Sequence, residues 1–242
     1  MQYTQWAIQQ NRKWQLEMQK SPSALSRVSQ RLQGKVNALI PEKAHRAITG
    51  AIRHMVEGVL FGAKHLSRVN AIDGPLHKVE AAAEERIKYY KHAAAAEGGI
   101  TGAGGFWTSM ADFPILLGMK LKLLFDIAAI YGYRVSDYRE RVYLLHVFQL
   151  AFSSQERRRE VFVGIRNWQD QAHLLPEDVQ DFDWRRFQQE YRDYIDIAKM
   201  AQLVPGIGAV VGFIANYQLM DRLGHTAMNA YRMRWREEGK LQ

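Results

Sequence analysis

Two segments rich in glycine and apolar residues constrain the fold of this 242-residue chain more than any other feature. They span residues 98–133 and 203–220. A glycine inside a helix costs about 1 kcal/mol relative to alanine, and five glycines fall within residues 98–105 alone. Close packing has to offset that cost, and it requires helix faces made of small residues. The glycines of these faces are Gly98, Gly102, Gly105, Gly208 and Gly212. Because faces of this kind let two backbones approach closely, we predict that the two segments pack against each other.

One polar residue stands at the end of each small-residue face. These residues are Asp112 and Asn216, and we predict that their side chains lie near one another. Asp112 is also placed to cap a helix that Pro114 opens, because aspartate accepts hydrogen bonds from the free N–H groups of a first turn and proline is tolerated there. This helix is predicted to reach about Tyr131 and to stop at Gly132.

Neither segment has the composition of a membrane-spanning helix, which needs about 20 mostly apolar residues. Charged residues interrupt the first segment, and the second contains proline, three glycines and two side-chain amides. Two interpretations therefore stay open. The segments are hairpins in the core of a soluble bundle, or they dip into the surface of a bilayer.

The remainder of the chain has the pattern of amphipathic helices. Polar and apolar residues alternate with helical spacing over long stretches, and only six prolines occur in the whole chain. No linker is long enough to separate two domains. We predict an all-α, single-domain helical bundle with two glycine-rich apolar helical hairpins at its centre.

The net charge of +8 is concentrated in the first third of the chain. Residues 1–70 carry eleven basic and three acidic side chains, whereas residues 71–242 carry 22 of each. We expect residues 1–40 to form basic amphipathic N-terminal helices and residues 41–242 to form the main helical domain. A positive region attracts lipid headgroups, nucleic acid or an acidic protein surface, although an ordinary solvated surface explains the same charges.

Five residues of the N-terminal unit fit a lipid-facing surface. A row of basic side chains flanks an apolar stripe, over which long basic side chains can extend. Tryptophan beside basic residues suits the headgroup level of a membrane, although packing against a core is its more common environment. The predicted lipid-facing residues are Trp6, Trp14, Arg27, Arg31 and Lys35.

Several classes of function lack their sequence signals. The chain contains no cysteine, which excludes disulfides, thiolate metal sites and a cysteine nucleophile. The first residues lack the apolar core of a signal peptide, so we expect a cytoplasmic protein. No recognition helix or base-stacking platform is evident, and no nucleic-acid partner is expected.

The glycine-rich segments resemble the EcsC family. The resemblance covers most of the chain from about residue 40 and is carried by Thr101-Gly102…Gly104-Gly105, Ala111-Asp112-Phe113-Pro114, Tyr131-Gly132-Tyr133, Pro205-Gly206-Ile207-Gly208-Ala209, Gly212, Asn216, Ala227 and Tyr231-Arg232…Arg234. That family takes its name from a protein encoded beside an ABC transporter. The resemblance therefore implies a membrane-linked accessory role, and it provides no catalytic residue to carry over.

Histidines and glutamates at helical spacing supply the metal candidates of this chain. His54 with Glu57, and His77 with Glu80, are HxxE pairs on two successive helices, which is the reverse order of the pairs in bundle metal sites. Surface ion pairs explain the same residues, and we expect no cofactor. The chain contains no HExxH, nucleophile elbow or Walker A sequence.

Two hypotheses of function follow. The first is a non-enzymatic accessory protein, peripheral at the inner face of the membrane, whose partner is an anionic membrane surface or a membrane protein complex such as an ABC transporter. The alternative is a hydrolase with Asp112 in a pocket near Tyr131 and Tyr133. The sequence specifies neither a substrate nor an oligomeric state.

Overall fold

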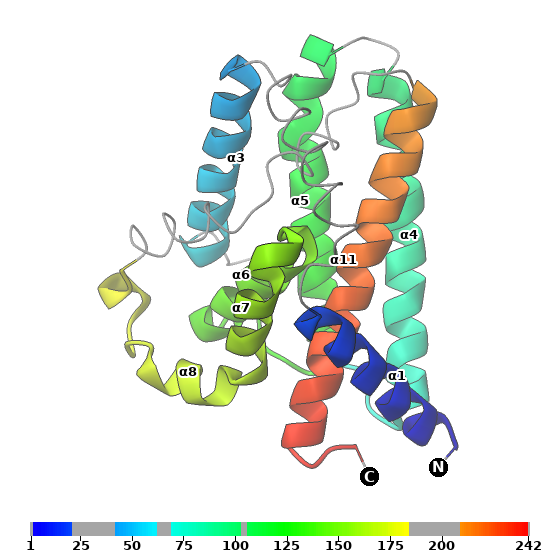
Figure 1. Ribbon diagram of the computed structural model, residues 1–242, viewed down its shortest axis with the longest axis vertical. Helices are drawn as coiled ribbons and strands as arrows, with labels where there is room; N and C mark the ends of the chain where they lie inside the picture. The colour runs from blue at the N-terminus through cyan, green and yellow to red at the C-terminus, as the bar shows by residue number, and fades with distance from the viewer. Residues whose placement is uncertain (1, 21–41, 62–68, 103–105, 184–208, 242) are drawn as a thin grey trace.

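A computed structural model describes residues 2–20, 42–61, 69–102, 106–183 and 209–241 (Figure 1). Toward the ends of several helices it describes the backbone alone. The described elements are all helical, with no strand among them, which confirms the predicted all-α class. They are α1 (Gln2–Gln19), α3 (Glu42–Phe61), α4 (Leu76–Gly102), α5 (Phe106–Ile130), α6 (Tyr138–Phe152), α7 (Gln155–Arg166), α8 (Trp168–Leu174), the 3₁₀ turn η2 (Val179–Asp181) and α11 (Ala209–Glu237).

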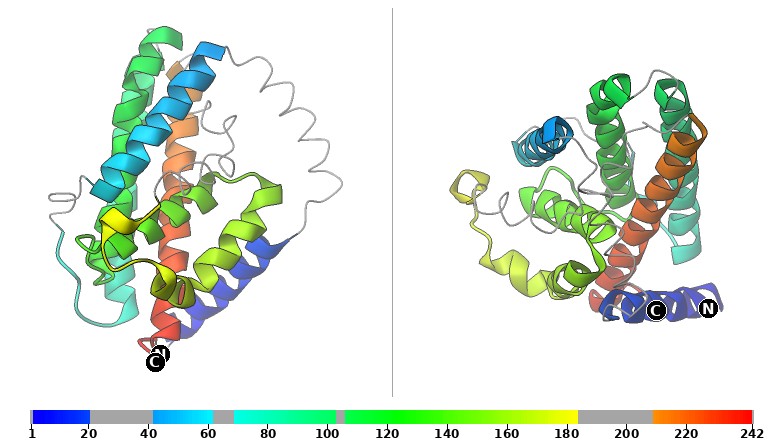
Figure 2. Two further views of the ribbon diagram at one scale, coloured as in Figure 1. Left: turned by 90° about the vertical axis from the view of Figure 1, so that its left-hand side faces the viewer. Right: turned by 45° about the horizontal axis from the view of Figure 1, so that its top comes forward.

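Three long helices, α4, α5 and α11, pack side by side, with α4 along the outer edge of the molecule (Figures 1 and 2). The most extensive contact in the described structure joins α4 and α11, followed by that between α4 and α5. Helices α6 and α7 pack on one side of this trio, and α3 lies along α5 and α6. Helix α1 crosses the bundle near one end and touches α4, α7 and α11.

Side-chain pairs fix α4 and α11 as antiparallel neighbours. Arg232 bonds to Glu80, Lys91 to Asp221, and the ring of Tyr217 lies 5.8 Å from that of His92. Midway between these pairs, a Cβ on Gly224 would lie only 2.4 Å from a side-chain carbon of Ile87. The two backbones therefore come close at a glycine, as small-residue packing requires.

This register can be extended toward the predicted glycine contacts. One to two turns beyond the His92–Tyr217 pair, the same register brings Gly98 of α4 level with Gly212 of α11. Both residues lie within the described helix backbones. Gly102 ends α4, whereas Gly105 and Gly208 lie outside the described residues. Packing of the two glycine-rich segments against each other thus remains a prediction.

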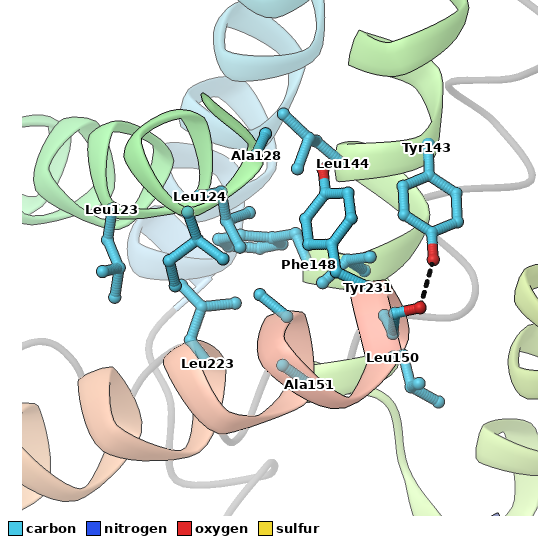
Figure 3. Close-up of a cluster of buried hydrophobic side chains, with 14 of the residues drawn as sticks. Leu123, Leu124, Ala128, Tyr143, Leu144, Phe148, Leu150, Ala151, Leu223 and Tyr231 are labelled. Atoms are coloured by element: carbon cyan, nitrogen blue, oxygen red, sulfur yellow. Dashed lines mark hydrogen bonds between the residues drawn. The ribbon is translucent and has the colours of Figure 1, made fainter. Parts of the chain in front are cut away.

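Part of the apolar core lies between α5, α6 and α11 (Figure 3). Leu123 and Leu124 of α5, Phe148 of α6 and Leu223 of α11 are fully buried there. The core also contains phenol groups, and the hydroxyl of Tyr143 donates to the carbonyl of Ala230 over 3.1 Å (Figure 3). Hydrogen bonding of this kind is what makes a polar atom tolerable in a core.

The two ends of α5 differ in how well the sequence predicts them. Gly132 follows the helix with φ of +84°, and the N–H groups of Gly132 and Tyr133 bond back to Ala129 and Ala128, so the predicted glycine stop is confirmed. The predicted start is wrong. The helix begins at Phe106 and contains Pro114 in its interior, where proline lacks the N–H that would bond to the fourth residue before it. Asp112 is therefore not the helix cap.

Helix α1 packs on the same core as the other helices, with Ala7 and Asn11 buried. The rest of the predicted N-terminal unit, residues 21–40, lies outside the described residues, so the boundary at residue 40 stays a prediction. None of the helices in the described part of the chain combines the length and hydropathy needed to cross a bilayer.

Candidate functional site

The predicted residues Tyr131, Gly132 and Tyr133 lie at the end of the bundle that α1 crosses, which we call the polar end (Figure 1). Here the first turns of α4, the last turn of α5 and the last turns of α11 come together. Tyr231, Arg232 and Arg234, which the family resemblance also highlights, come from α11. Helix α1 contributes Tyr3 and Thr4.

A buried carboxylate organises the first half of this end. Glu80 has no exposed surface, and Arg232 meets it with two hydrogen bonds, of 2.5 and 2.7 Å. The hydroxyls of Tyr3 and Tyr131 donate to the same carboxylate over 2.6 and 3.3 Å. Bidentate pairing of this kind gives both energy and geometric specificity. One carboxylate therefore connects α1, α4, α5 and α11.

A second buried carboxylate lies on α6. Glu140 accepts from Tyr231 over 2.5 Å and from Arg234 over 2.7 Å. Burial raises the pKa of Glu140, while the charge of Arg234 and the two hydrogen bonds oppose that rise. Arg232 and Arg234 thus point to different carboxylates, and the short stretch from Tyr231 to Arg234 binds α11 to both α4 and α6.

Stacked aromatic rings fill the space between the two ion pairs. Tyr231 stacks on Tyr133 with 4.9 Å between ring centroids and on Tyr131 with 5.3 Å. The guanidinium of Arg234 lies 3.8 Å from the ring centre of Tyr133, within cation–π range. Burial raises the pKa of Tyr131 and of Tyr231 well above the usual phenol value, which keeps both hydroxyls protonated as donors.

A pocket of about 500 Å³ opens beside this network. Its wall includes Thr4 of α1, Asp73 of the connection to α4, Tyr131, Trp235 and Lys240. The ammonium of Lys240 is paired with Glu238 at 2.5 Å. Tyr131 is a lining residue whose hydroxyl donates to a carboxylate, but that carboxylate, Glu80, is already bound by Arg232. The pocket has groups for binding, and no reaction is assigned to it.

Helix α1 presents opposite chemistry on its two faces. Toward the bundle, Asn11 donates to the backbone carbonyl and the side chain of Asn229 over 2.9 and 3.1 Å. Away from the bundle, Trp6 is 49% exposed and Leu16 is 64% exposed. Arg12 and Lys13 of this helix are exposed as well, and so is Lys20 directly after its last residue.

The predicted lipid-facing set divides into three parts. Trp6 is exposed, as a lipid-facing residue must be. Trp14 does not fit the set, because it is half-buried and packs edge-on against Phe162 with ring centroids 5.6 Å apart. Arg27, Arg31 and Lys35 lie outside the described residues.

The hydrolase alternative is wrong in its geometry. Asp112 and Tyr131 lie near opposite ends of α5, which is one continuous helix from Phe106 to Ile130. At 1.5 Å per residue, about 28 Å of helix separates the two. No pocket near Tyr131 and Tyr133 can therefore contain Asp112.

Two buried polar side chains lie toward the other end of the trio. Asn216 of α11 has no exposed surface, and neither atom of its amide has a hydrogen-bond partner in the described structure. Lys120 of α5 is equally buried, and its one described contact is 3.5 Å to the carbonyl of Leu116 on its own helix. Burial lowers the pKa of Lys120 to about 7. The side chain of Asp112 lies outside the described residues, so its proximity to Asn216 stays a prediction.

The four metal candidates do not come together. His54 and Glu57 form a contact of 3.7 Å on the outer side of α3, while Glu80 is buried and bound by Arg232. His77 lies by the ring of Tyr3. Within the described ranges, no three His, Asp or Glu side chains form a group that could hold a metal ion.

Sequence reasoning missed several residues of the polar end, above all Glu140, Tyr143 and Trp235. Glu80 was predicted only as a metal candidate, and one signal could have identified it as a buried, paired charge. It shares the apolar face of α4 with Leu76, Val79 and Ala83, and a charge on such a face requires a buried partner.

Comparison with known proteins gives the chain a family context. Residues 5–235 match the model of the EcsC protein family. The chain is 43% identical over 231 residues to Protein EcsC of Bacillus subtilis (strain 168), which covers 95% of both chains. It is also 32% identical over 160 residues to the uncharacterized protein YdbA of the same organism. That match covers 66% of this chain and 59% of YdbA. No solved structure matches the chain.

Proposed function

Since this chain belongs to the EcsC protein family, we propose that it is a membrane-surface-associated accessory protein that docks on anionic lipid through the outer face of α1. We place it at the inner face of the cytoplasmic membrane. The membrane-linked role implied by the family resemblance is the starting point of this proposal. Docking on lipid would bring the protein next to a membrane protein complex such as an ABC transporter.

The outer face of α1 is the observation that carries the proposal. Trp6 and Leu16 are the most exposed of its large apolar side chains. Exposed Lys13 shares their side of the helix, and exposed Lys20 directly follows its last residue. An interfacial helix combines apolar side chains that enter the acyl boundary with basic side chains that meet anionic headgroups. Each such cation contributes about 1 kcal/mol near an anionic surface.

The polar end supports docking by holding α1 rigidly. Tyr3 bonds to Glu80 at one end of the helix, and Asn11 bonds to Asn229 near its middle. Trp14 packs on α7 beyond these bonds. Because the helix is already formed and oriented, little conformational entropy remains to be lost when its outer face meets a membrane.

Vesicle flotation tests the proposal. The purified chain is mixed at low ionic strength with vesicles of phosphatidylglycerol and phosphatidylcholine in equal parts, and separately with phosphatidylcholine alone. We expect flotation with the anionic vesicles, weakening as salt rises. The charge-reversal variant Lys13→Glu/Lys20→Glu should lower partitioning at least about 30-fold, and Trp6→Ser/Leu16→Ser should also lower it.

A matched control separates docking from general stickiness. Leu174 is the most exposed large apolar residue of the described structure, at 84%, and it lies on α8 away from α1. The variant Leu174→Ser should float like the unmodified chain. If the unmodified chain fails to float, or if all three variants float equally well, α1 is not a membrane-docking helix.

A further inference from the structure

A trough of about 400 Å³ runs between α3 and α5, separate from the polar end and from α1. Its buried floor is formed by Met55 and Val59 of α3 and by Phe125 of α5. Its volume lies within the range of about 300–1,000 Å³ that holds small molecules. The lining is mainly apolar, so the trough suits a hydrocarbon group.

Two glycines keep the trough open, one on each helix. A Cβ placed on Gly58 or on Gly118 would have no atom of the structure within 4 Å. Any larger side chain at either position would project into this free space. Ile115 is 50% exposed one turn before Gly118, and it extends the apolar surface along α5.

A cation stands at the rim of this apolar surface. Lys122 lines the trough and is exposed. In the ranges that the structure describes, no carboxylate is paired with it. His54 lines the trough as well, and its nearest acid is Glu57, at 3.7 Å on the same helix. The trough thus combines a hydrocarbon-lined floor with a positive charge that lacks a described counter-ion.

We propose that the trough between α3 and α5 binds a single-chain anionic amphiphile, a fatty acid, with its hydrocarbon chain over Val59 and Phe125 and its carboxylate at Lys122. Burial of the chain supplies most of the affinity, since removing each methylene from water is favourable. The ammonium of Lys122 selects the charged headgroup. This site does not depend on membrane docking by α1.

Titration calorimetry with dodecanoate below its micellar concentration tests the site, with dodecan-1-ol as a neutral ligand of the same chain length. We expect saturable binding of one dodecanoate per chain, tighter than that of the alcohol. Gly58→Leu and Gly118→Leu fill the trough and should weaken dodecanoate binding at least tenfold. Gly50→Leu is the matched control, because Gly50 lies on α3 with the same open space but does not line the trough.

Lys122→Gln tests the headgroup without touching the floor. We expect it to weaken dodecanoate about fivefold and to leave the alcohol unchanged. Absence of dodecanoate binding to the unmodified chain overturns the proposal, and so does binding that survives both leucine variants. Equal affinity for dodecanoate and dodecan-1-ol overturns the assignment of Lys122 to the headgroup. If the trough instead holds a peptide segment, neither ligand will bind, and the proposal is overturned.

Discussion

Buried polar groups have opposite surroundings toward the two ends of the bundle. At the polar end, Glu80 meets Arg232 and Glu140 meets Arg234, and tyrosine hydroxyls complete both carboxylates. Toward the glycine-rich end, Lys120 and Asn216 are equally buried, yet the described structure gives the amide no partner and gives the ammonium one carbonyl at 3.5 Å.

This difference separates two effects of burying a polar group. Where partners are in place, the group specifies which helices meet and in what register. Where partners are lacking, desolvation is uncompensated and the group destabilises the fold. We therefore expect substitutions at the two ends to change stability in opposite directions.

The largest expected effect is at the polar end. Arg232→Ala leaves Glu80 as a buried charge without its cation, and it should lower the free energy of unfolding by about 4 kcal/mol. Urea denaturation measures this change. The control is Arg236→Ala on the same helix, where the side chain is exposed, with an expected change within about 0.5 kcal/mol. A loss at Arg232 no larger than that of the control would contradict the importance of this ion pair.

The next effect has the opposite sign. Lys120→Met keeps the length of the side chain and removes the uncompensated amine, so it should raise the free energy of unfolding by about 3 kcal/mol. Thermal and urea unfolding at neutral pH provide the measurement. Its exposed neighbour on α5 supplies the control, since Lys122→Met removes no buried charge. Destabilisation by Lys120→Met would show that the ammonium has a partner after all.

The pH dependence sharpens the same prediction. The pKa of Lys120 falls from 10.5 to about 7 in the folded chain because burial disfavours the charged amine. Between these values the unfolded chain binds more protons, so the contribution of Lys120 to stability rises with pH from about 7 to about 10.5. Below pH 7 the full cost of the buried charge applies. The gain from Lys120→Met should therefore be greatest near pH 6 and shrink toward pH 10, and a gain independent of pH would reject this explanation.

Gly224 allows a test between the two ends. Its Cβ position lies 2.4 Å from Ile87, so Gly224→Ala should force α4 and α11 apart and cost about 2 kcal/mol. Gly118→Ala meets open space on a helix and should instead gain about 1 kcal/mol. Chemical denaturation of the two variants compares them directly, and equal effects would show that the α4–α11 contact is not tight at Gly224.

The smallest effect is expected at Asn216. Replacing the amide by leucine of similar size removes two buried polar atoms without described partners, and stability should rise by about 1 kcal/mol. Denaturant midpoints of Asn216→Leu and the unmodified chain measure this. A clear loss would point to a hydrogen bond from a side chain that the structure does not describe, and the side chain of Asp112 is the partner that the sequence predicts.

Periodicity predicted the helices better than the contacts between them. The apolar stripe of α4 is visible as Leu76, Val79, Ala83 and Ile87, and the glycine after α5 marks its end. The predicted start of α5 was wrong because proline is favoured in the first turn of a helix. That preference does not indicate whether a longer helix tolerates a proline in its interior. Local preferences cannot weigh one lost hydrogen bond against the packing of a whole helix.

The sequence did not predict which buried charged side chains pair with each other. Glu80 and Arg232 are 152 residues apart along the chain, and their pairing follows from the register of α4 against α11. Glycine content predicted close packing of residues 98–133 with 203–220, and this stays a prediction. It did not indicate that Gly224 is the glycine against Ile87, because that depends on the side chain of the opposing helix.

The Tyr3–Glu80 hydrogen bond connects α1 to a fully buried carboxylate. Pulling α1 outward would remove one of the donors that hold this carboxylate, and Arg232 and Tyr131 would have to compensate. The two events are linked thermodynamically. A change in how strongly Arg232 and Tyr131 bind Glu80 also changes the free energy needed to displace α1. Displacement of α1 at the surface would therefore change the hydrogen bonding of a buried carboxylate in the core.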